Sequence, residues 1–179
     1  SDRTYLEVNE LNAMEGGNTG SPITNQTFMF CCFTGLRHSD MLALRWKDIQ
    51  KTDDGFVIHV PSIQKTKKPV IVLLGEQALK WMPKQGDATK TDKVFPNAPT
   101  LGCANIALKH MAKNAGISKL VTFHTSRHTF ATLTITAGAD IFTTSKLLGH
   151  TNVHTTEIYA DVVMGTKVDA VNLVSGFFG

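Results

Sequence analysis

Two histidines and an arginine occur within five positions in the stretch HTSRH, where they are His124, Arg127 and His128. Such a cluster can bind a metal ion, bind a phosphate group, or do neither. The spacing of four between His124 and His128 recurs between His150 and His154. On a helix this spacing places both rings on one face, which suits a zinc site.

The neighbouring residues disfavour a metal. The zinc motif HExxH needs a glutamate directly after its first histidine, and Thr125 occupies that position here. Arg127 lies between the two histidines and would repel a divalent cation. No acidic cluster accompanies these histidines in the sequence. We therefore expect no metal and no cofactor.

A phosphate fits the same residues better. The N-terminus of a helix presents unpaired N–H groups and a partial positive charge, and His124 lies at such a predicted start. Arg127 follows by about one turn, and a guanidinium can bind two phosphate oxygens at once. Arg37 is predicted to open another short helix after Gly35. Asp40 either orients that guanidinium or caps the helix.

Composition limits the class of protein. Hydrophobic residues make up 42% and charged residues 18%, which is typical of a soluble globular domain rather than a disordered chain. The formal net charge of +3 permits nucleic-acid binding without requiring it. The polar N-terminal sequence does not resemble a signal peptide, and no apolar run approaches the roughly 18 residues of a membrane helix. We expect no membrane association.

The cysteines indicate a reducing compartment. Cys31, Cys32 and Cys103 are odd in number and form no CxxC pair. We therefore expect reduced thiols in the core of a cytoplasmic protein.

The elements that position these residues are mainly helical. Thr4-x-x-Glu7 reads as a capping box that begins a first helix, with Leu6, Leu11 and Met14 on one face. β-rich runs between Ile49 and Leu74, GFVIHVPSI and PVIVLL, predict a small antiparallel sheet. Other helices are predicted from Ser21-Pro22 through FMFCCFTG, in LRHSDMLALRW, in GEQALKWM, in LGCANIALKHMAKNAG, and over about 124–137, 140–148, 152–160 and 165–175. The predicted fold class is mainly α with a small antiparallel β-sheet (α+β), in one domain over 1–179.

Five segments in order resemble the signature of the tyrosine recombinases, the phage-integrase family. They are TGLRHSDML, QKT, HTSRHTFAT, LLGH and TNVHTTEIY, and the resemblance covers nearly the whole chain. It implies a mostly helical catalytic domain with a three-stranded sheet. It also implies an N-terminal core-binding domain, which is absent from residues 1–179.

The resemblance assigns roles to four residues of the phosphate site. Arg37 and Arg127 correspond to the two phosphate-binding arginines, and His124 to the histidine of H-x-x-R. His150 corresponds to the histidine of LGH. His128 and Asp40 are expected to support these residues without contacting the phosphate themselves. The chain departs from the family pattern at Asp40, where glutamate is commoner, and at Ser126, where leucine is frequent.

The remaining two assignments concern the hairpin lysine and the nucleophile. Lys65 in QKT corresponds to the general acid on the β-hairpin, with Lys67 or Lys68 as alternatives because the hairpin lacks the frequent GKGxK form. Tyr159 corresponds to the nucleophile. The sequence has only one other tyrosine, Tyr5, near the N-terminus. Because a free phenol has a pKa of about 10, Tyr159 needs a cationic pocket or a base to attack at neutral pH.

The resemblance implies a site-specific DNA recombinase or integrase that cleaves and rejoins strands through a covalent 3′-phosphotyrosine, for a mobile element. Its expected partner is double-stranded DNA, on which the full-length protein forms a homotetramer with accessory DNA-bending proteins. The expected location is cytoplasmic, at the nucleoid. Two alternatives stay open: DNA relaxation of the type IB topoisomerase kind, and a non-catalytic DNA-binding remnant of the same fold.

Overall fold

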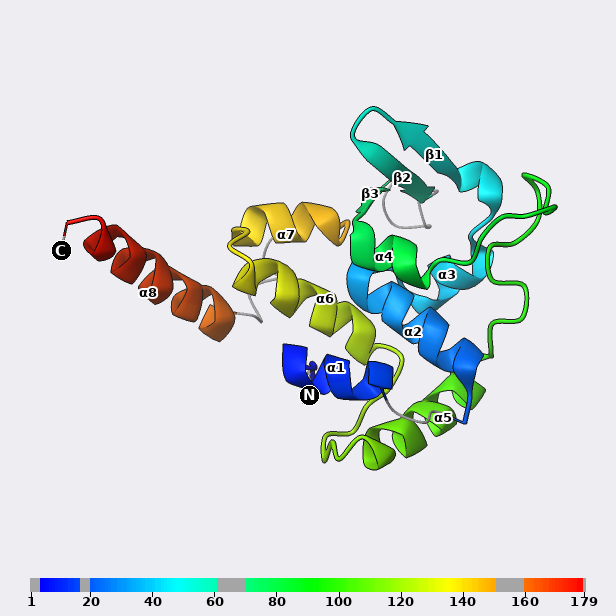
Figure 1. Ribbon diagram of the computed structural model, residues 1–179, viewed down its shortest axis with the longest axis horizontal. Coiled ribbons are helices and arrows are strands. Elements are labelled where there is room, and N and C mark those ends of the chain that lie inside the picture. The colour runs from blue at the N-terminus through cyan, green and yellow to red at the C-terminus, as the bar shows by residue number, and fades with distance from the viewer. Residues whose placement is uncertain (1–3, 17–19, 61–69, 151–159, 179) are drawn as a thin grey trace. The chain divides into compact units, whose positions relative to one another are not determined.

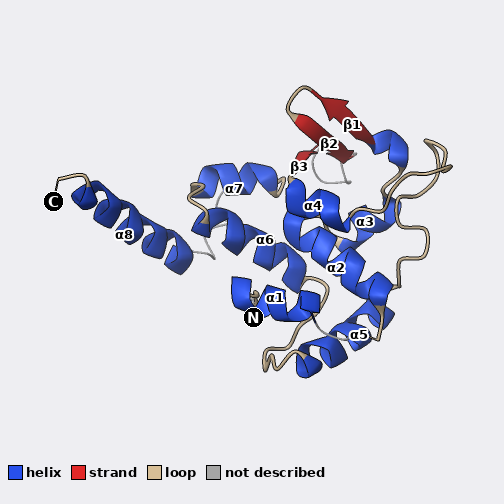
Figure 2. Cartoon of the chain, in the orientation of Figure 1, coloured by secondary structure: helices blue, strands red, loops and turns tan. Residues whose placement is uncertain are grey.

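The computed structural model describes residues 4–16, 20–60, 70–150 and 160–178 (Figure 1). Within these ranges the chain forms eight α-helices, one 3-10 helix and one three-stranded sheet (Figure 2). The mainly helical α+β class predicted from the sequence is confirmed. The chain divides into two units, residues 1–130 and residues 131–179.

Helix α2 (Pro22–Thr34) forms the centre of the first unit. It contacts helices α1 (Val8–Gly16), α3 (His38–Ala43), α4 (Glu76–Trp81) and α5 (Leu101–Asn114) and strand β3 (Val70–Leu74). It begins with a proline, whose fixed φ suits the first helical turn, and ends at Gly35 in the left-handed conformation. Its run from Phe28 to Cys32 is buried on all sides. This confirms the buried helix predicted from FMFCCFTG, because a helix that is apolar all round must be covered by neighbours.

The sheet consists of β1 (Ile49–Thr52), β2 (Gly55–Val60) and β3 (Val70–Leu74), antiparallel in the order β1-β2-β3. Ile58 pairs with Ile49 on one side and with Val72 on the other, and it is buried. Both predicted strands are present. The strand β1 was not predicted from its own residues, because IQKT carries only one strongly apolar side chain.

Four further elements complete the first unit before α6. Helix α3 (His38–Ala43) and the 3-10 helix η1 (Trp46–Asp48) lead from α2 into the sheet. Helix α4 (Glu76–Trp81) follows the sheet, and α5 (Leu101–Asn114) follows a long loop. These helices agree with the predicted segments. Cys103 lies exposed on α5, so the prediction that all three thiols are in the core is wrong for this residue, although Cys31 and Cys32 are buried.

Helix α1 (Val8–Gly16) begins four residues later than the predicted cap. Leu6, Leu11 and Met14 are buried as expected. The predicted box from Thr4 to Glu7 is wrong: Glu10 instead accepts a 3.0 Å hydrogen bond from the backbone N–H of Glu7. The Glu10 carboxylate, in the first turn of α1, therefore caps the helix at Glu7. The cap lies about one turn further along the chain than the sequence pattern predicts.

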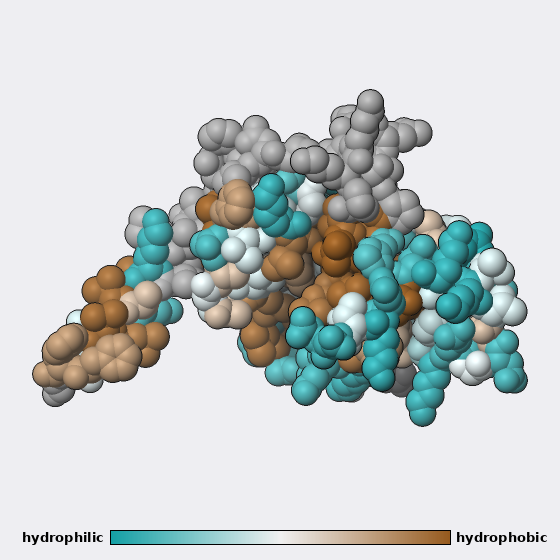
Figure 3. Space-filling model, turned by 90° about the horizontal axis from the view of Figure 1, so that it is seen from above, coloured by the Kyte–Doolittle hydropathy of each residue, from teal (hydrophilic) through white to brown (hydrophobic). Residues whose placement is uncertain are grey.

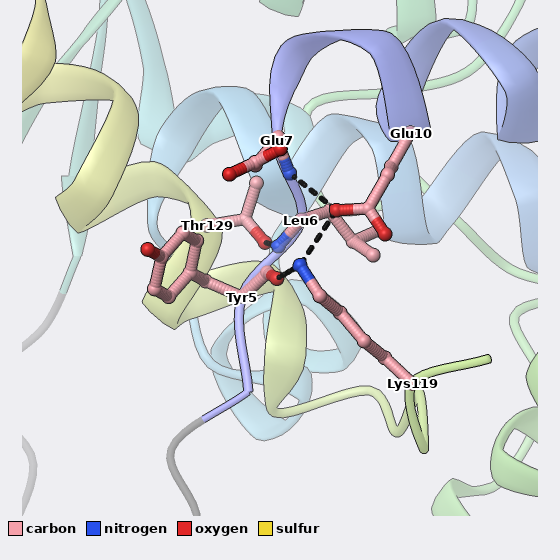
Figure 4. Close-up of polar contacts among 6 residues, drawn as sticks. All are labelled: Tyr5, Leu6, Glu7, Glu10, Lys119 and Thr129. Atoms are coloured by element: carbon pink, nitrogen blue, oxygen red, sulfur yellow. Dashed lines mark hydrogen bonds and ion pairs between the residues drawn. The ribbon is translucent and has the colours of Figure 1, made fainter. Parts of the chain in front are cut away.

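The segment before α1 is held to two other parts of the unit (Figure 4). The backbone N–H of Leu6 donates to the hydroxyl of Thr129 at 3.0 Å, and both residues are fully buried. The ammonium of Lys119 donates to the carbonyl oxygen of Tyr5 at 3.0 Å and to the carboxylate of Glu10 at 2.6 Å. The N-terminal segment is thus bonded directly to helix α6 (Thr125–Thr136).

The second unit contains the end of α6, then α7 (Ile141–Leu147) and α8 (Ala160–Gly176). Asp140 caps α7 by accepting from the backbone N–H of Thr143 at 2.6 Å. Helix α8 begins earlier than the predicted tail of 165–175, and the predicted helix over 152–160 falls almost entirely outside the described residues.

Helix α8 carries a row of exposed apolar side chains, which form the brown cluster at the left end of the view in Figure 3. Leu173 is 71% exposed and Phe178, just beyond the helix, is 87% exposed. Within the described ranges, no helix combines the length and the apolar character needed to cross a membrane.

Candidate functional site

The turn at Gly35 positions the first candidate arginine. Gly35 has φ +72°, and a Cβ built on it would lie 2.5 Å from the ring of Phe130 on α6. A side chain at this position would therefore meet both backbone strain and a steric clash. Two residues later Arg37 lies at the N-cap of α3 in extended conformation and is exposed. The turn that leads to Arg37 therefore lies directly against the ring of Phe130 on α6.

The second candidate arginine lies in the first turns of α6 and is buried. Arg127 is only 8% exposed, and its Nη1 donates a 2.7 Å hydrogen bond to the carbonyl oxygen of Gly35. A buried guanidinium requires hydrogen-bond acceptors, and this carbonyl is one of them. The hydrogen bond joins α6 to the end of α2.

The segment entering α6 is anchored at Phe123. Its backbone N–H donates to the side-chain oxygen of Asn105 on α5 at 2.8 Å, and its carbonyl accepts from the hydroxyl of Ser126 at 2.6 Å. Its ring is 1% exposed and meets the rings of Phe28 and His38 edge to face. His124 directly precedes the first helical residue and is exposed, as predicted for a helix start.

Arg37, His124 and Arg127 line one open hollow of about 230 Å³. All of its lining lies in the first unit, at the start of α3 and the turn before it, on α5, and at the start of α6 and the segment before it. The other residues around it are Leu36, His38, Ser39, Leu101, Phe123 and Ser126. Because two arginines and a histidine line it, the hollow suits a phosphate group.

Electrostatics at the hollow favour an anion. Although the residue is exposed, partial desolvation of its ring lowers the pKa of His124 below its ordinary value, and the positive charges of Arg127 and Arg37 lower it further. The imidazole is therefore mainly neutral at pH 7 and can accept a proton. Burial raises the pKa of Asp40, while the charges of Arg37 and Arg127 oppose that rise. Asp40 is thus an acidic neighbour of both arginines.

Two histidines adjoin the predicted residues. The ring of His128 packs against that of His124, with centroids 4.6 Å apart. His38, to which the sequence analysis assigned no role, lines the hollow itself. Its position immediately after Arg37 was the only signal in the sequence that could have pointed to this place.

The remaining predicted residues lie either outside the described residues or in the second unit. Lys65, Tyr159 and the alternatives Lys67 and Lys68 lie outside the described residues. His150 belongs to the second unit, where its backbone N–H donates to the carbonyl of Ser145 at 2.9 Å. Among the residues that the structure describes, no group of three or more His, Cys, Asp or Glu side chains could hold a metal ion.

Comparison with known proteins gives consistent matches. A family model described as Phage integrase family matches residues 5–165. The tyrosine recombinase XerD of Chlorobaculum tepidum is 34% identical over 146 residues, which are 74% of this chain and 46% of that protein. The crystal structure of XerA recombinase has a TM-score of 0.73 at 25% identity, covering 93% of this chain and 63% of that chain.

A further structure, XerH site-specific recombinase bound to palindromic difH substrate in a post-cleavage complex, has a TM-score of 0.69 at 19% identity. The match covers 97% of this chain and 54% of that chain. These likenesses agree with the helical fold and its small sheet. The chain spans about half the length of the curated relatives it matches, 46% and 56% for two XerD proteins.

Proposed function

The chain belongs to the Phage integrase family, and we propose that it is the catalytic domain of a site-specific DNA recombinase. The observation that carries this proposal is the convergence of Arg37, His124 and Arg127 on one hollow. The proposed domain comprises residues 1–179. A separate N-terminal DNA-binding domain is proposed to account for the part of the relatives that this chain does not span.

The proposed reaction is a transesterification on a DNA phosphodiester. The phenolic oxygen of Tyr159 attacks phosphorus, the bond from phosphorus to the 5′ oxygen breaks, and the phosphate stays on the 3′ oxygen. His124 takes the phenolic proton, while Lys65, or alternatively Lys67 or Lys68, protonates the leaving 5′ oxygen. Because the 3′-phosphotyrosine conserves a phosphoester bond, a 5′-hydroxyl from another strand can reverse the step and exchange strands.

The arginines act on charge that develops during this step. As phosphorus becomes five-coordinate, negative charge grows on its non-bridging oxygens. Arg37, Arg127 and His150 are proposed to bind these oxygens most strongly at that moment, which lowers the barrier. The buried position of Arg127 supports this role, since a guanidinium already removed from water interacts strongly with an anion and needs little reorganisation.

The proposed partner is double-stranded DNA, supported by the family and by the likeness to a recombinase solved on its DNA substrate. The exposed apolar side chains of α8 are proposed to pack on a neighbouring subunit in a homotetramer formed on DNA. Accessory DNA-bending proteins are proposed to assist the assembly, and a mobile element is the proposed context. The proposed location is the nucleoid within the cytoplasm.

The test uses the full-length protein and a nicked suicide substrate carrying the ends of its own element, in EDTA. After denaturation, protein joined covalently to DNA is isolated and the attached residue is mapped by mass spectrometry. We expect an adduct on Tyr159. Tyr159→Phe should abolish the adduct and leave non-covalent binding nearly unchanged, because only the nucleophilic oxygen is lost.

Tyr5→Phe is the matched control, since it removes the only other phenol while keeping the ring beside the Lys119 ammonium. An adduct on Tyr5 would contradict the assignment. DNA binding without any adduct, on several candidate sites, would favour the non-catalytic remnant. Relaxation of any supercoiled plasmid by the monomer would favour topoisomerase activity of the type IB kind.

A further inference from the structure

His38 joins three parts of the hollow that are far apart in the sequence. Its Nε2–H donates to the carbonyl oxygen of Pro99 at 2.9 Å, just before α5. Its ring meets the ring of Phe123 edge to face, with centroids 4.7 Å apart. It is the first residue of α3, so these contacts fix the start of that helix to the loop before α5 and to the segment before α6.

The contact between His38 and Phe123 lies one residue away from two candidate catalytic groups. Arg37 directly precedes His38, and His124 directly follows Phe123. Phe123 itself cannot shift freely, because Asn105 holds its backbone and Phe28 holds its ring. The His38–Phe123 contact therefore sets the separation between the backbones that carry Arg37 and His124.

We propose that His38 is a positioning residue, which holds Arg37 and His124 at the spacing required to act on one phosphate group. The proposal rests on the proposed function for its catalytic consequence. It goes beyond that function because none of the assigned roles includes His38. Positioning matters because Arg37 is an exposed, long side chain at a helix N-cap, and only the fixed backbone beneath it limits where its guanidinium reaches.

Three substitutions separate the two contacts. His38→Phe keeps an aromatic ring beside Phe123 but loses the hydrogen bond to Pro99. His38→Gln can keep an N–H donor for Pro99 but loses the ring, and His38→Ala loses both. His110→Ala is the matched control, because it removes an exposed histidine on α5 that does not line the hollow.

The first readout is the rate of adduct formation at saturating DNA, measured together with DNA affinity. For His38→Ala we expect a rate roughly ten- to a hundredfold lower, with a much smaller change in affinity. His38→Phe and His38→Gln should each recover part of that loss. Thermal unfolding of each variant checks that the rates are compared on folded protein. If His38→Ala does not fold, the rates of His38→Phe and His38→Gln are compared with that of the wild type instead.

The second readout needs neither DNA nor activity. The pKa of His124 is measured by NMR titration, since burial and the nearby charges of Arg127 and Arg37 hold it below its ordinary value. In His38→Ala we expect the pKa of His124 to rise toward its ordinary value, because Arg37 moves away and the ring gains water.

The outcomes are distinguishable from failure of the proposed function. If the wild type and His110→Ala form no adduct, the proposed function fails, while the titration still tests whether His38 positions Arg37 against His124. A wild-type cleavage rate in His38→Ala would overturn the proposal. An unchanged pKa of His124 in that variant would also overturn it, and would leave His38 as a residue of stability alone.

Discussion

The guanidinium of Arg127 and the carbonyl oxygen of Gly35 are joined by a 2.7 Å hydrogen bond across 92 positions of sequence. The acceptor is a backbone atom, so its position depends on the conformation of the turn rather than on any side chain. That turn is left-handed and is packed against Phe130, one helical turn beyond Arg127. The end of α2 and the start of α6 therefore both fix the position of the buried arginine.

Gly35→Ala should destabilise the protein and disturb this hydrogen bond. The new Cβ would adopt an unfavourable positive φ, at a cost of about 1–2 kcal/mol. It would also push against the Phe130 ring, which adds about 1–3 kcal/mol. We expect the free energy of unfolding, measured by denaturant titration, to fall by both amounts and the cleavage rate to fall with it.

Gly116→Ala is the matched control for this change. Gly116 has φ +74°, almost the same as Gly35, but nothing lies within 4 Å of an added Cβ. Gly116→Ala should therefore lower the unfolding free energy only by the cost of the positive φ. Equal losses of unfolding free energy at the two positions would contradict the role given to the contact with Phe130.

Thr129→Val tests the bond between the N-terminal segment and α6. The substitution preserves shape but leaves the buried N–H of Leu6 without its acceptor at 3.0 Å, which should cost about 1–3 kcal/mol in unfolding free energy. Thr27→Val is the control at an equally buried position, where the hydroxyl donates to the helix carbonyls of Ile23 and Thr24. A loss at Thr129 no greater than at Thr27 would argue against the bond as a structural link.

His124 should make stability depend on pH in a defined direction. Its pKa in the fold is lowered below the ordinary value of 6.5, first by burial and then by Arg127 and Arg37. The unfolded chain therefore binds a proton more readily, so the stabilising contribution is present above about pH 6.5 and is lost as the pH falls through the folded pKa. Denaturant titrations at a series of pH values should show this loss.

His124→Gln cannot be protonated, so it isolates the contribution of this residue from that of the other histidines. The difference in unfolding free energy between the wild type and His124→Gln should change steadily as the pH falls below 6.5. A difference that is constant between pH 7.5 and pH 5 would show that the pKa of His124 is not lowered.

Asp40→Asn should separate stability from activity. The pKa of Asp40 is raised by burial, despite the opposing charges of Arg37 and Arg127, so the charged form is disfavoured in the fold. The protonated Asp40 carboxyl therefore contributes stability below its ordinary pKa of 3.8, and this contribution is lost as the pH rises through the pKa of Asp40 in the folded protein. Asn resembles the protonated form and should therefore raise the melting temperature at pH 7, with no gain below pH 3.8.

The same substitution should lower the rate of adduct formation, because the arginines lose their acidic neighbour. Thermal unfolding at the two pH values and the suicide-substrate assay measure these effects separately. A lower melting temperature at pH 7 would show that the carboxylate stabilises the folded protein through the arginines rather than serving their orientation.

The sequence by itself determined the kinds of element and the residues of the candidate site. Glycine at helix ends, proline at a helix start and alternating apolar residues act within a few positions, so they predicted α2, β2 and β3 directly. The HTSRH and TGLRHSD segments predicted Arg37, Arg127 and His124 as candidate site residues for the same local reason. Local pattern was less reliable at the ends of elements, as the misplaced cap of α1 shows.

Only the tertiary structure decided how these residues meet. Nothing in the sequence near Arg127 indicates that its guanidinium is buried on the carbonyl of Gly35, or that Phe130 excludes a side chain at Gly35. Likewise, the contacts of His38 with Pro99 and Phe123 join segments 61 and 85 residues away. Such contacts arise when helices that form locally pack against one another, and no single window of sequence contains both partners.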